Sequence, residues 1–523
     1  MKKIFIIGLM ILVLFGSSSC DKWLDLKPES EIVLDEYWKS EGDVDAVLAS
    51  CYKSLTEDDV IARMIVWGEL RSDNIVVGYN GIDTKRYDMY RILEGNLTPT
   101  NAYSSWGSFY SVINYCNTLL YYAPYVIDRD ENFTAADLNR VKAEALSIRS
   151  LCYFYLVRSF KEVPWMDEAS ISDSQNYNKA KSSEDEVLNH IISDLEFAKK
   201  YVSTDFGRTD YNKGRFTLDA VNALLADIYL WKMDYANCVK SCDQILASKK
   251  LKLESPLYSF IHVFYLGNST ESIFELQFNE NVQKNNMVIV LYGSSSKTYG
   301  ELRFPTNLMF NPYTVKGGVY SPFNYPVPSS STLFEGTKDI RSKQSYNINS
   351  GNIFKYAGVM EADNAAGTDA LYGYRSSTPN WIIYRLSDVM LMKAEALVEL
   401  DGETNLKNAI TLVNYSYTRS NEGQDTLAYA NYNSKPAMED LVLRERQREL
   451  MFEGKRWYDL VRLARRENST GTLNTFVDHK SSGNAGSLGA PVMNAMYMPI
   501  SRSEIESNPK LKQNPYYATS SSN

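Results

Sequence analysis

The sequence is poor in the side chains that most metal and nucleophile sites require. Its 523 residues include three histidines, His190, His262 and His479, which stand far apart and without neighbouring ligand patterns. A histidine-based metal site is therefore not expected, because such sites draw several ligands from clustered residues. The chain also lacks a glycine-rich phosphate loop that follows a predicted strand, and it has no G-x-S-x-G motif. The usual signatures of nucleotide enzymes and α/β hydrolases are thus missing.

A surplus of positive charge is absent as well. Lys and Arg number 55 against 64 Asp and Glu, which gives a formal net charge of −9 at pH 7. Nucleic-acid-binding proteins carry a basic stripe, and anionic lipid surfaces attract basic clusters, so neither class of partner is predicted. No cofactor is predicted either, and the sequence leaves open whether a structural calcium ion is bound.

Cysteine is scarce, and its count does not suit a disulfide framework. The chain has six cysteines, and five remain when Cys20, in the N-terminal segment, is left out of the count. At least one thiol therefore stays free or pairs between molecules. Cys238 and Cys242 stand four residues apart, a spacing that one helix face could offer to a metal. Since no other Cys or His is nearby, two small buried side chains are the favoured interpretation.

Long apolar runs are absent except at the very start of the chain. Two lysines precede an apolar run at Ile4–Phe15 and the stretch "GSSSC", which ends at Cys20. This order predicts a secretory signal peptide at 1–19, since the run is shorter than the roughly 20 apolar residues of a spanning helix. A cysteine directly after three serines indicates bacterial lipoprotein processing, with Cys20 as the lipidated first residue of a tether at 20–35. The alternative is an ordinary secreted protein with a chance cysteine.

The stretch "IRSLCYFYLVRSFKEVPW" (148–165) is rich in aromatic residues, and its apolar positions recur at helical spacing. Arg149, Arg158 and Lys161 exclude a bilayer span, because each charge in hydrocarbon costs roughly 2.5–3.5 kcal/mol or more. Pro164 is predicted to end the helix. We therefore expect a nearly all-round buried helix inside a scaffold, and not a membrane segment or a ligand-binding face.

Other segments predict the helices that this one packs against. Thr217–Ser248 reads as two amphipathic helices joined by a turn at Met233–Asp234, as in a tetratricopeptide-type pair. Ile382–Arg419 shows a related arrangement, and Glu184–Val202 is expected to pair with the helix before it. Such pairs bury their second faces against neighbours, so the sequence predicts a stacked α-helical scaffold.

Two loop-like regions, 72–106 and 262–380, carry many tyrosines among Gly, Pro, Ser and Asn. A tyrosine ring offers an apolar face and a polar edge, which suits sugar rings with their C–H faces and hydroxyl rims. The alternative is that these rings pin long loops onto the body. The candidate ligand-binding residues are Tyr79, Asn80, Arg86, Tyr103, Tyr313 and Tyr320.

The densest charge cluster is "LRERQRELMFEGKRWYDLVRLARR" (443–466). Glu445, Glu449 and Glu453 are predicted to share one helix stripe, which raises the hypothesis of a glycosidase acid and base. The interleaved arginines would keep these carboxylates ionised, whereas a general acid needs a raised pKa. An ion-pair network around the turn at Gly454 is the preferred interpretation.

Several motifs, in the same order along the chain, resemble the SusD/RagB family of outer-membrane nutrient-binding lipoproteins. They are "SCDKWLDLKPES", "AEALSIRSLCYFYLVRSFKEVPW", "WIIYRLSDVMLMKAEALVEL", "ERQRELMFEGKRWYDLVR" and "YMPISRSEIESNPKLKQNPYY". The likeness covers nearly the whole mature chain. Lys161 stands where the family usually has Gly before "VP". The stretch "LVNYSYTRS" keeps Asn414 and Arg419 of an Asn…Arg family pattern but lacks the arginine that usually stands between them. Both departures lie in scaffold motifs.

The resemblance implies a mostly α fold with tetratricopeptide-like helical pairs and a loop-rich variable face carrying short strands. It divides the mature chain into an N-terminal SusD-like helical region at 36–261, a loop-rich variable region at 262–380 and a C-terminal RagB/SusD-like helical region at 381–523. The family's ligand residues lie in variable loops, so only Cys20 is carried over by motif.

The resemblance also implies a function without catalysis. Such proteins sit on the outer membrane, lipid-anchored and facing the cell exterior, as the lid of a TonB-dependent SusC-like transporter in polysaccharide utilisation. Glycan is the expected ligand, and an oligopeptide, as in the RagB branch, is the alternative. A surface glycoside hydrolase using Glu445 or Glu449 is a remote third hypothesis. Asp21 would favour inner-membrane retention under proteobacterial sorting rules, so the surface location rests on the resemblance.

Overall fold

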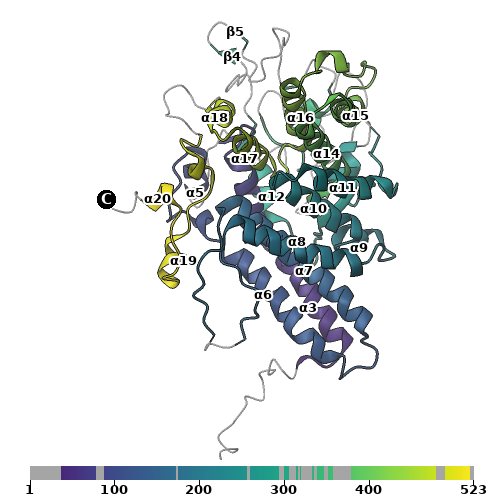
Figure 1. Ribbon diagram of the computed structural model, residues 1–523, viewed down its shortest axis with the longest axis vertical. Helices are drawn as coiled ribbons and strands as arrows, with labels where there is room; N and C mark the ends of the chain where they lie inside the picture. Colours follow the sequence, from purple (N-terminus) through teal and green to yellow (C-terminus); the bar gives the residue numbers. More distant parts are fainter. Residues whose placement is uncertain are drawn as a thin grey trace, which may run out of the picture.

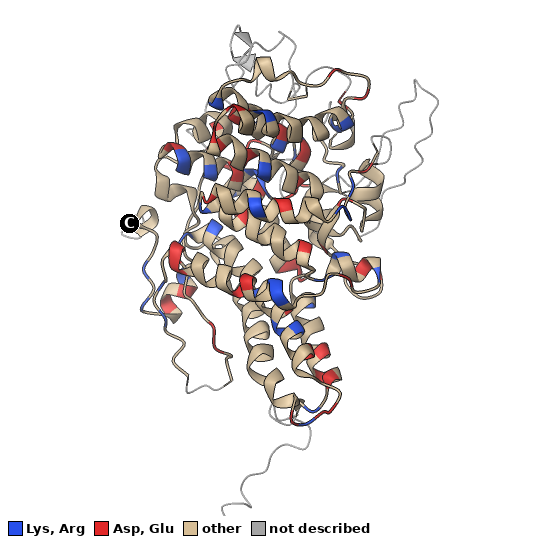
Figure 2. Cartoon of the chain, turned by 45° about the vertical axis from the view of Figure 1, so that its right-hand side comes forward, with Lys and Arg blue, Asp and Glu red and all other residues tan. Residues whose placement is uncertain are grey.

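A computed structural model shows the mostly helical architecture that the sequence predicts. It describes residues 37–77, 87–171, 175–255, 259–293, 300–304, 314–315, 318–319, 333–334, 339–346, 351–356, 378–478 and 489–518. Within these ranges no helix combines the length and the apolar composition that a bilayer crossing requires. Acidic and basic residues are interspersed over the helices, and neither sign dominates the face seen in Figure 2.

Helices account for most of the described residues, and the segments marked η are π-helical (η2, η6) or 3-10 turns. In chain order they are α3 (Glu41–Ser54), α4 (Asp58–Ile65), η2 (Val66–Leu70), α5 (Tyr87–Leu93), η4 (Ala102–Ser104), α6 (Gly107–Tyr122), η5 (Ala123–Val126), α7 (Ala135–Phe160), α8 (Glu184–Tyr201), α9 (Thr209–Gly214), α10 (Leu218–Trp231), α11 (Tyr235–Ala247), η6 (Ile261–Leu266), α12 (Asn286–Tyr292), α13 (Arg341–Gln344), α14 (Leu386–Leu400), α15 (Glu403–Ser420), η7 (Tyr429–Asn431), α16 (Lys435–Leu450), α17 (Arg456–Glu467), α18 (Gly471–Asp478), η8 (Met493–Met496), α19 (Arg502–Ser507) and α20 (Pro515–Ala518).

The described strands are short and form three antiparallel pairs. They are β1 (Val76–Val77) with β3 (Leu302–Arg303), β2 (Ser272–Leu276) with β6 (Trp381–Arg385), and β4 (Thr314–Val315) with β5 (Gly318–Val319).

The scaffold is a stack of helical pairs (Figure 1). Helix α7 packs on α8, α10 on α11 and α14 on α15, while contacts of α8 with α10 and of α11 with α14 join successive pairs. The predicted pairs and the turn at Met233–Asp234 are thus confirmed. Ala220, Ala223 and Ala226 of α10 are fully buried, and their small side chains let neighbouring helices approach closely.

Helix α7 lies inside the body, as predicted, and its arginines have specific partners. Arg149 donates to Asp194 Oδ2 at 2.6 Å, and Arg158 donates to Asp227 Oδ2 at 3.1 Å. The Arg158 guanidinium also lies 4.0 Å from the Phe154 ring centroid, a favourable cation–π distance. These pairings allow charged residues in a nearly all-round buried helix.

Two predicted helix boundaries are wrong. Helix α7 ends at Phe160, before Pro164, because Lys161 takes a left-handed φ of 71° and turns the chain. The segment before Leu386 is strand β6 and not the start of a helix. Its residues are all buried and mostly aromatic or β-branched, which suits the pairing with β2.

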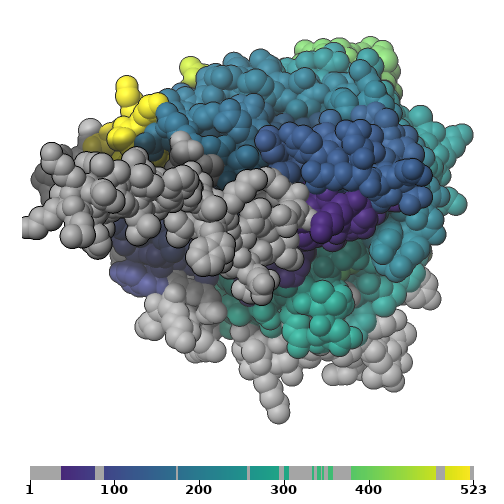
Figure 3. All heavy atoms as spheres, turned by 90° about the horizontal axis from the view of Figure 1, so that it is seen from below, coloured from purple at the N-terminus to yellow at the C-terminus, as the bar shows by residue number. Residues whose placement is uncertain are grey.

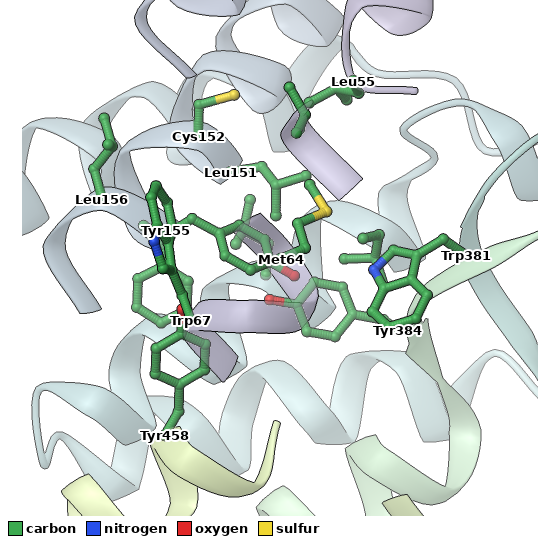
Figure 4. Packing of buried hydrophobic residues seen from close by; sticks show 14 of the residues in the cluster. Leu55, Met64, Trp67, Leu151, Cys152, Tyr155, Leu156, Trp381, Tyr384 and Tyr458 are labelled. Atoms are coloured by element: carbon green, nitrogen blue, oxygen red, sulfur yellow. The ribbon is translucent and has the colours of Figure 1, made fainter. Parts of the chain in front are cut away.

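The core gathers aromatic rings from segments far apart in sequence (Figure 4). Trp67 from η2, Tyr155 from α7, Trp381 and Tyr384 from β6, and Tyr458 from α17 surround one region with aliphatic side chains between them. The Tyr384 hydroxyl is not left unpaired there, since it donates to Asp227 Oδ2 at 2.9 Å.

A close backbone contact fixes the C-terminal half of the chain against the N-terminal half. A Cβ atom on Gly68 would lie 1.9 Å from the carbonyl oxygen of Gly454, so only glycine fits there. The neighbouring Glu69 is fully buried, and its carboxylate accepts N–H groups from Phe452 and Gly454 at 3.0 and 3.1 Å. Residues of η2 therefore hold the turn that follows α16.

We expect Gly68→Ala to lower the free energy of unfolding by about 1–3 kcal/mol, the usual cost of overpacking, because backbone atoms must move. Thermal unfolding followed by circular dichroism measures the change. Gly42→Ala is the matched control, since its added Cβ would meet only Ser40 Oγ, at 3.6 Å. Equal unfolding midpoints for the two variants would show that the Gly68–Gly454 contact is not tight.

Candidate ligand-binding face

Strands β1 and β3 join the two tyrosine-rich regions of the sequence. Val76 pairs with Arg303 and Val77 with Leu302, so the chain segments on either side of this ribbon start from adjacent points. The candidate residues Tyr79, Asn80, Arg86, Tyr313 and Tyr320 lie outside the described residues. The segment that carries Tyr79, Asn80 and Arg86 lies between β1 and α5, which begins at Tyr87.

Tyr103 lies in η4 and is partly buried against the core. Its backbone carbonyl accepts the indole N–H of Trp67 at 2.9 Å, and its ring centroid lies 5.9 Å from the Arg63 guanidinium. Asn101 caps the turn, and its side-chain amide donates to the Asp88 carbonyl of α5 at 2.8 Å. Tyr103 thus has packing contacts of the kind that hold a loop on the body.

Helix α5 presents an aromatic surface that was not predicted from the sequence. Tyr87 is 60% exposed, and its ring stacks on Tyr90 with centroids 6.3 Å apart and planes inclined by 28°. The Arg91 guanidinium lies 5.9 Å from the Tyr87 ring centroid. We name Tyr87, Tyr90 and Arg91 the tyrosine face. A hydrogen bond with the Glu94 carboxylate raises the pKa of Tyr90, whose hydroxyl therefore stays protonated at neutral pH.

The helical pattern of "YDMYRIL" is the signal that could have identified these residues. Met89, Ile92 and Leu93 are the buried positions of α5, which leaves Tyr87 and Tyr90 on the outer side. Because 72–106 was predicted to be loop, the two sides of this short helix were not distinguished from the sequence. The tyrosine face lies on the left in Figure 1, where α5 is labelled, and α9 and α15 lie on the right.

The glutamate cluster forms a buried ion-pair network, as preferred from the sequence. Arg341 Nη1 donates to Glu445 Oε1 at 2.7 Å, and Arg385 Nη1 donates to Glu449 Oε1 at 2.6 Å. The predicted stripe of three glutamates on one helix is wrong, since α16 ends at Leu450 and Glu453 belongs to the following turn.

Glu449 is held in its ionised form. Burial alone would raise its pKa, but the guanidinium groups of Arg419, Arg385 and Arg341 hold the pKa of Glu449 well below its ordinary value. A cavity of about 30 Å³ beside this carboxylate is large enough for a water molecule and too small for a sugar ring. A general acid needs the opposite pKa shift and a substrate cleft, so the geometry does not support the glycosidase role.

In the part of the chain that the structure describes, no group of three or more His, Cys, Asp or Glu side chains is arranged so that it could hold a metal ion. Cys51, Cys116, Cys152, Cys238 and Cys242 are all buried free thiols. The favoured interpretation of Cys238 and Cys242 as small buried side chains is confirmed.

Comparison with known proteins gives consistent matches over the chain. A sequence profile described as "Starch-binding associating with outer membrane" matches residues 22–230, and one described as the SusD family matches residues 294–517. A SusD-like protein of Formosa agariphila is 25% identical over 99% of this chain and 99% of its own length. A SusD-like protein of Bacteroides ovatus is 23% identical over 86% of this chain and 80% of its own length.

Solved structures share the fold. A SusD superfamily protein from Bacteroides thetaiotaomicron superposes with a TM-score of 0.67 at 21% identity, over 92% of this chain and 100% of that chain. NanU from Bacteroides fragilis gives a TM-score of 0.65 at 22% identity, over 94% and 100% of the two chains.

We expect Glu449→Gln to destabilise the protein by about 3–5 kcal/mol, because it leaves buried guanidinium groups without their countercharge. Differential scanning calorimetry measures the loss. Glu506→Gln, on the exposed side of α19, is the control and should change stability by about 0.5 kcal/mol or less. Two results together would revive the hydrolase hypothesis. The wild type would have to release reducing ends from polysaccharide, and Glu449→Gln would have to lose this activity while unfolding at the same temperature as the wild type.

Proposed function

The chain belongs to the SusD/RagB family, and we propose that it is a surface lipoprotein that binds glycan and serves as the lid of a SusC-like TonB-dependent transporter. The observation that carries the glycan assignment is the stacked pair of exposed Tyr87 and half-buried Tyr90 beside Arg91, near the β1–β3 pairing that joins the two tyrosine-rich regions. Aromatic faces bind the C–H faces of sugars, and arginine donates hydrogen bonds to hydroxyls.

The role in import is supported by the family relationship and by the family description, which includes association with the outer membrane. Attachment is assigned to Cys20, and the proposal includes no catalytic step and no cofactor. Glu449 supports the absence of a catalytic step, since it is ionised, enclosed and beside a water-sized cavity. An oligopeptide is the competing ligand, and the first experiment separates the two.

We expect native gel electrophoresis of the chain from Asp21 onward to show retardation in a lane containing one of amylopectin, laminarin, galactomannan or xylan. The double variant Tyr87→Ala, Tyr90→Ala should weaken this binding about tenfold, because it removes two aromatic contacts of about 0.5–1.5 kcal/mol each. Tyr415→Ala is the matched control, since Tyr415 is 52% exposed on α15, away from this face.

Unchanged retardation of the double variant would remove the tyrosine face from the site. If no polysaccharide retards the wild type, while peptides co-purify with it and are identified by mass spectrometry, the oligopeptide hypothesis replaces the glycan assignment.

We expect Cys20→Ala to abolish incorporation of labelled palmitate and to move the protein from the membrane fraction to the soluble fraction, because the acyl chains are the proposed anchor. Ser19→Ala keeps a small residue before the cysteine and should remain labelled. Membrane retention of an unlabelled Cys20→Ala protein would show that a different segment attaches it.

A further inference from the structure

A groove lies between α3, α9 and the segment 277–279, away from the tyrosine face. Its volume is about 620 Å³, within the range of small-molecule sites. Figure 3 shows α3 in purple, with blue helices on one side of it and teal segments on the other. The groove is lined by Asp45, Leu48, Ala49, Tyr52, Asp210, Tyr211, Gly214, Arg215, Gln277, Phe278 and Asn279. We name it the α3–α9 groove.

The floor of this groove is a fixed hydrogen-bond network. Arg215 donates to both carboxylate oxygens of Glu144, at 2.9 and 2.7 Å, and Glu144 is fully buried. The Tyr52 hydroxyl donates to Glu144 at 2.8 Å and accepts the Phe216 N–H at 2.9 Å. These side chains are therefore already positioned, and a ligand would meet a preorganised surface.

Charges around the groove are balanced. Arg208 forms a two-point contact with Asp210, at 3.1 and 2.6 Å, as Arg215 does with Glu144. Asp45, at the rim, lies 3.7 Å from an Arg140 guanidinium nitrogen. A ligand with a full charge would have to compete with these pairs, whereas a neutral polar ligand would not.

Hydrogen-bonding groups and apolar surface remain available on the groove wall. Tyr211 is 43% exposed, and Arg208 lies 4.3 Å from its ring centroid. Within the described part of the chain, the Tyr211 hydroxyl and the Asn279 amide N–H₂ make no hydrogen bond. The Asn279 side-chain oxygen is used, since it accepts the backbone N–H groups of residues 281 and 282. Leu48 and Phe278 line the groove but are only 2% and 7% exposed, so the Tyr211 ring is the main apolar surface open to a ligand.

We propose that the α3–α9 groove is a second saccharide site, which takes a short neutral segment of glycan. The Tyr211 ring contacts sugar C–H faces, while Asp45 and the Asn279 amide bind hydroxyls. This inference rests on the proposed glycan-binding function and adds a site apart from the tyrosine face. Two sites on one chain raise the avidity for a polysaccharide without changing either site alone.

The test compares variants of the full mature chain. Tyr211→Ala should bind amylopectin, laminarin, galactomannan or xylan, whichever retards the wild type, about two- to tenfold more weakly. In equilibrium dialysis with maltotriose, laminaritriose, mannotriose and xylotriose, Tyr211→Ala should lose one class of sites. The double variant Tyr87→Ala, Tyr90→Ala should lose the other class. Tyr201→Ala, at the same 43% exposure on α8, is the matched control.

Asp45→Asn is a second groove variant that leaves α9 intact and should also weaken binding. If Tyr211→Ala and Asp45→Asn bind every probe like Tyr201→Ala, while the tyrosine-face variant loses all binding, the groove proposal fails and the proposed function stands. If the wild type binds none of the polysaccharides or trisaccharides, both fail together. A tryptic peptide mixture that protects Tyr211 from iodination, where no saccharide does, would also overturn the groove assignment.

Discussion

The fold depends on one buried carboxylate, that of Glu69, which holds the turn at Phe452–Lys455. It accepts the backbone N–H groups of this turn and the Asn74 amide, and no solvent reaches it. Burial raises the pKa of Glu69 to about 7, while the Asn74 amide and the backbone N–H donors oppose that rise. An apolar side chain here would leave several buried N–H groups unpaired, which costs more than the hydrogen bonds themselves contribute. Because η2 and the turn come from opposite halves of the chain, this contact joins the two halves.

Buried ion pairs extend from that turn into the loop-rich region. Lys355 donates to Glu453 at 2.7 Å, and Arg341 binds both Asp339 and Glu445. Such pairs require near-ideal geometry to offset the cost of removing charges from water. They fix where segments 339–346 and 351–356 attach to α16. The loop-rich region is therefore anchored to the helical scaffold by ion pairs with Glu445 and Glu453. These glutamates belong to the charge cluster that raised the hypothesis of a catalytic site.

Regular periodicity made much of the scaffold predictable, but the exact ends of the helices were not predictable. The α10–α11 pair and its turn follow from apolar spacing, as does the burial of α7. Strand β6 was missed because a short apolar run is equally consistent with a strand or a helix, and only its partner β2, more than a hundred residues away, decides between them.

The candidate ligand-binding face was harder to predict from the sequence than the scaffold. Tyr103 was predicted to bind ligand, and its role in binding stays a prediction; its packing against Trp67 and Arg63 depends on tertiary contacts that the sequence does not reveal. Tyr87 and Tyr90 were missed because their region was taken as loop.

The β1–β3 ribbon separates the part of the molecule that must be conserved in shape from the part that can be exchanged. It pairs only two residues on each strand, yet with α5 it fixes both ends of segment 78–86 against the scaffold. Since the entropy of closing a loop grows slowly with its length, a longer or shorter segment between these anchors costs little stability. Under the proposed function, recombination at these two points would exchange part of the candidate ligand-binding face and leave the core unchanged. The helical stack would then be a constant scaffold, and ligand specificity would evolve without changes in it.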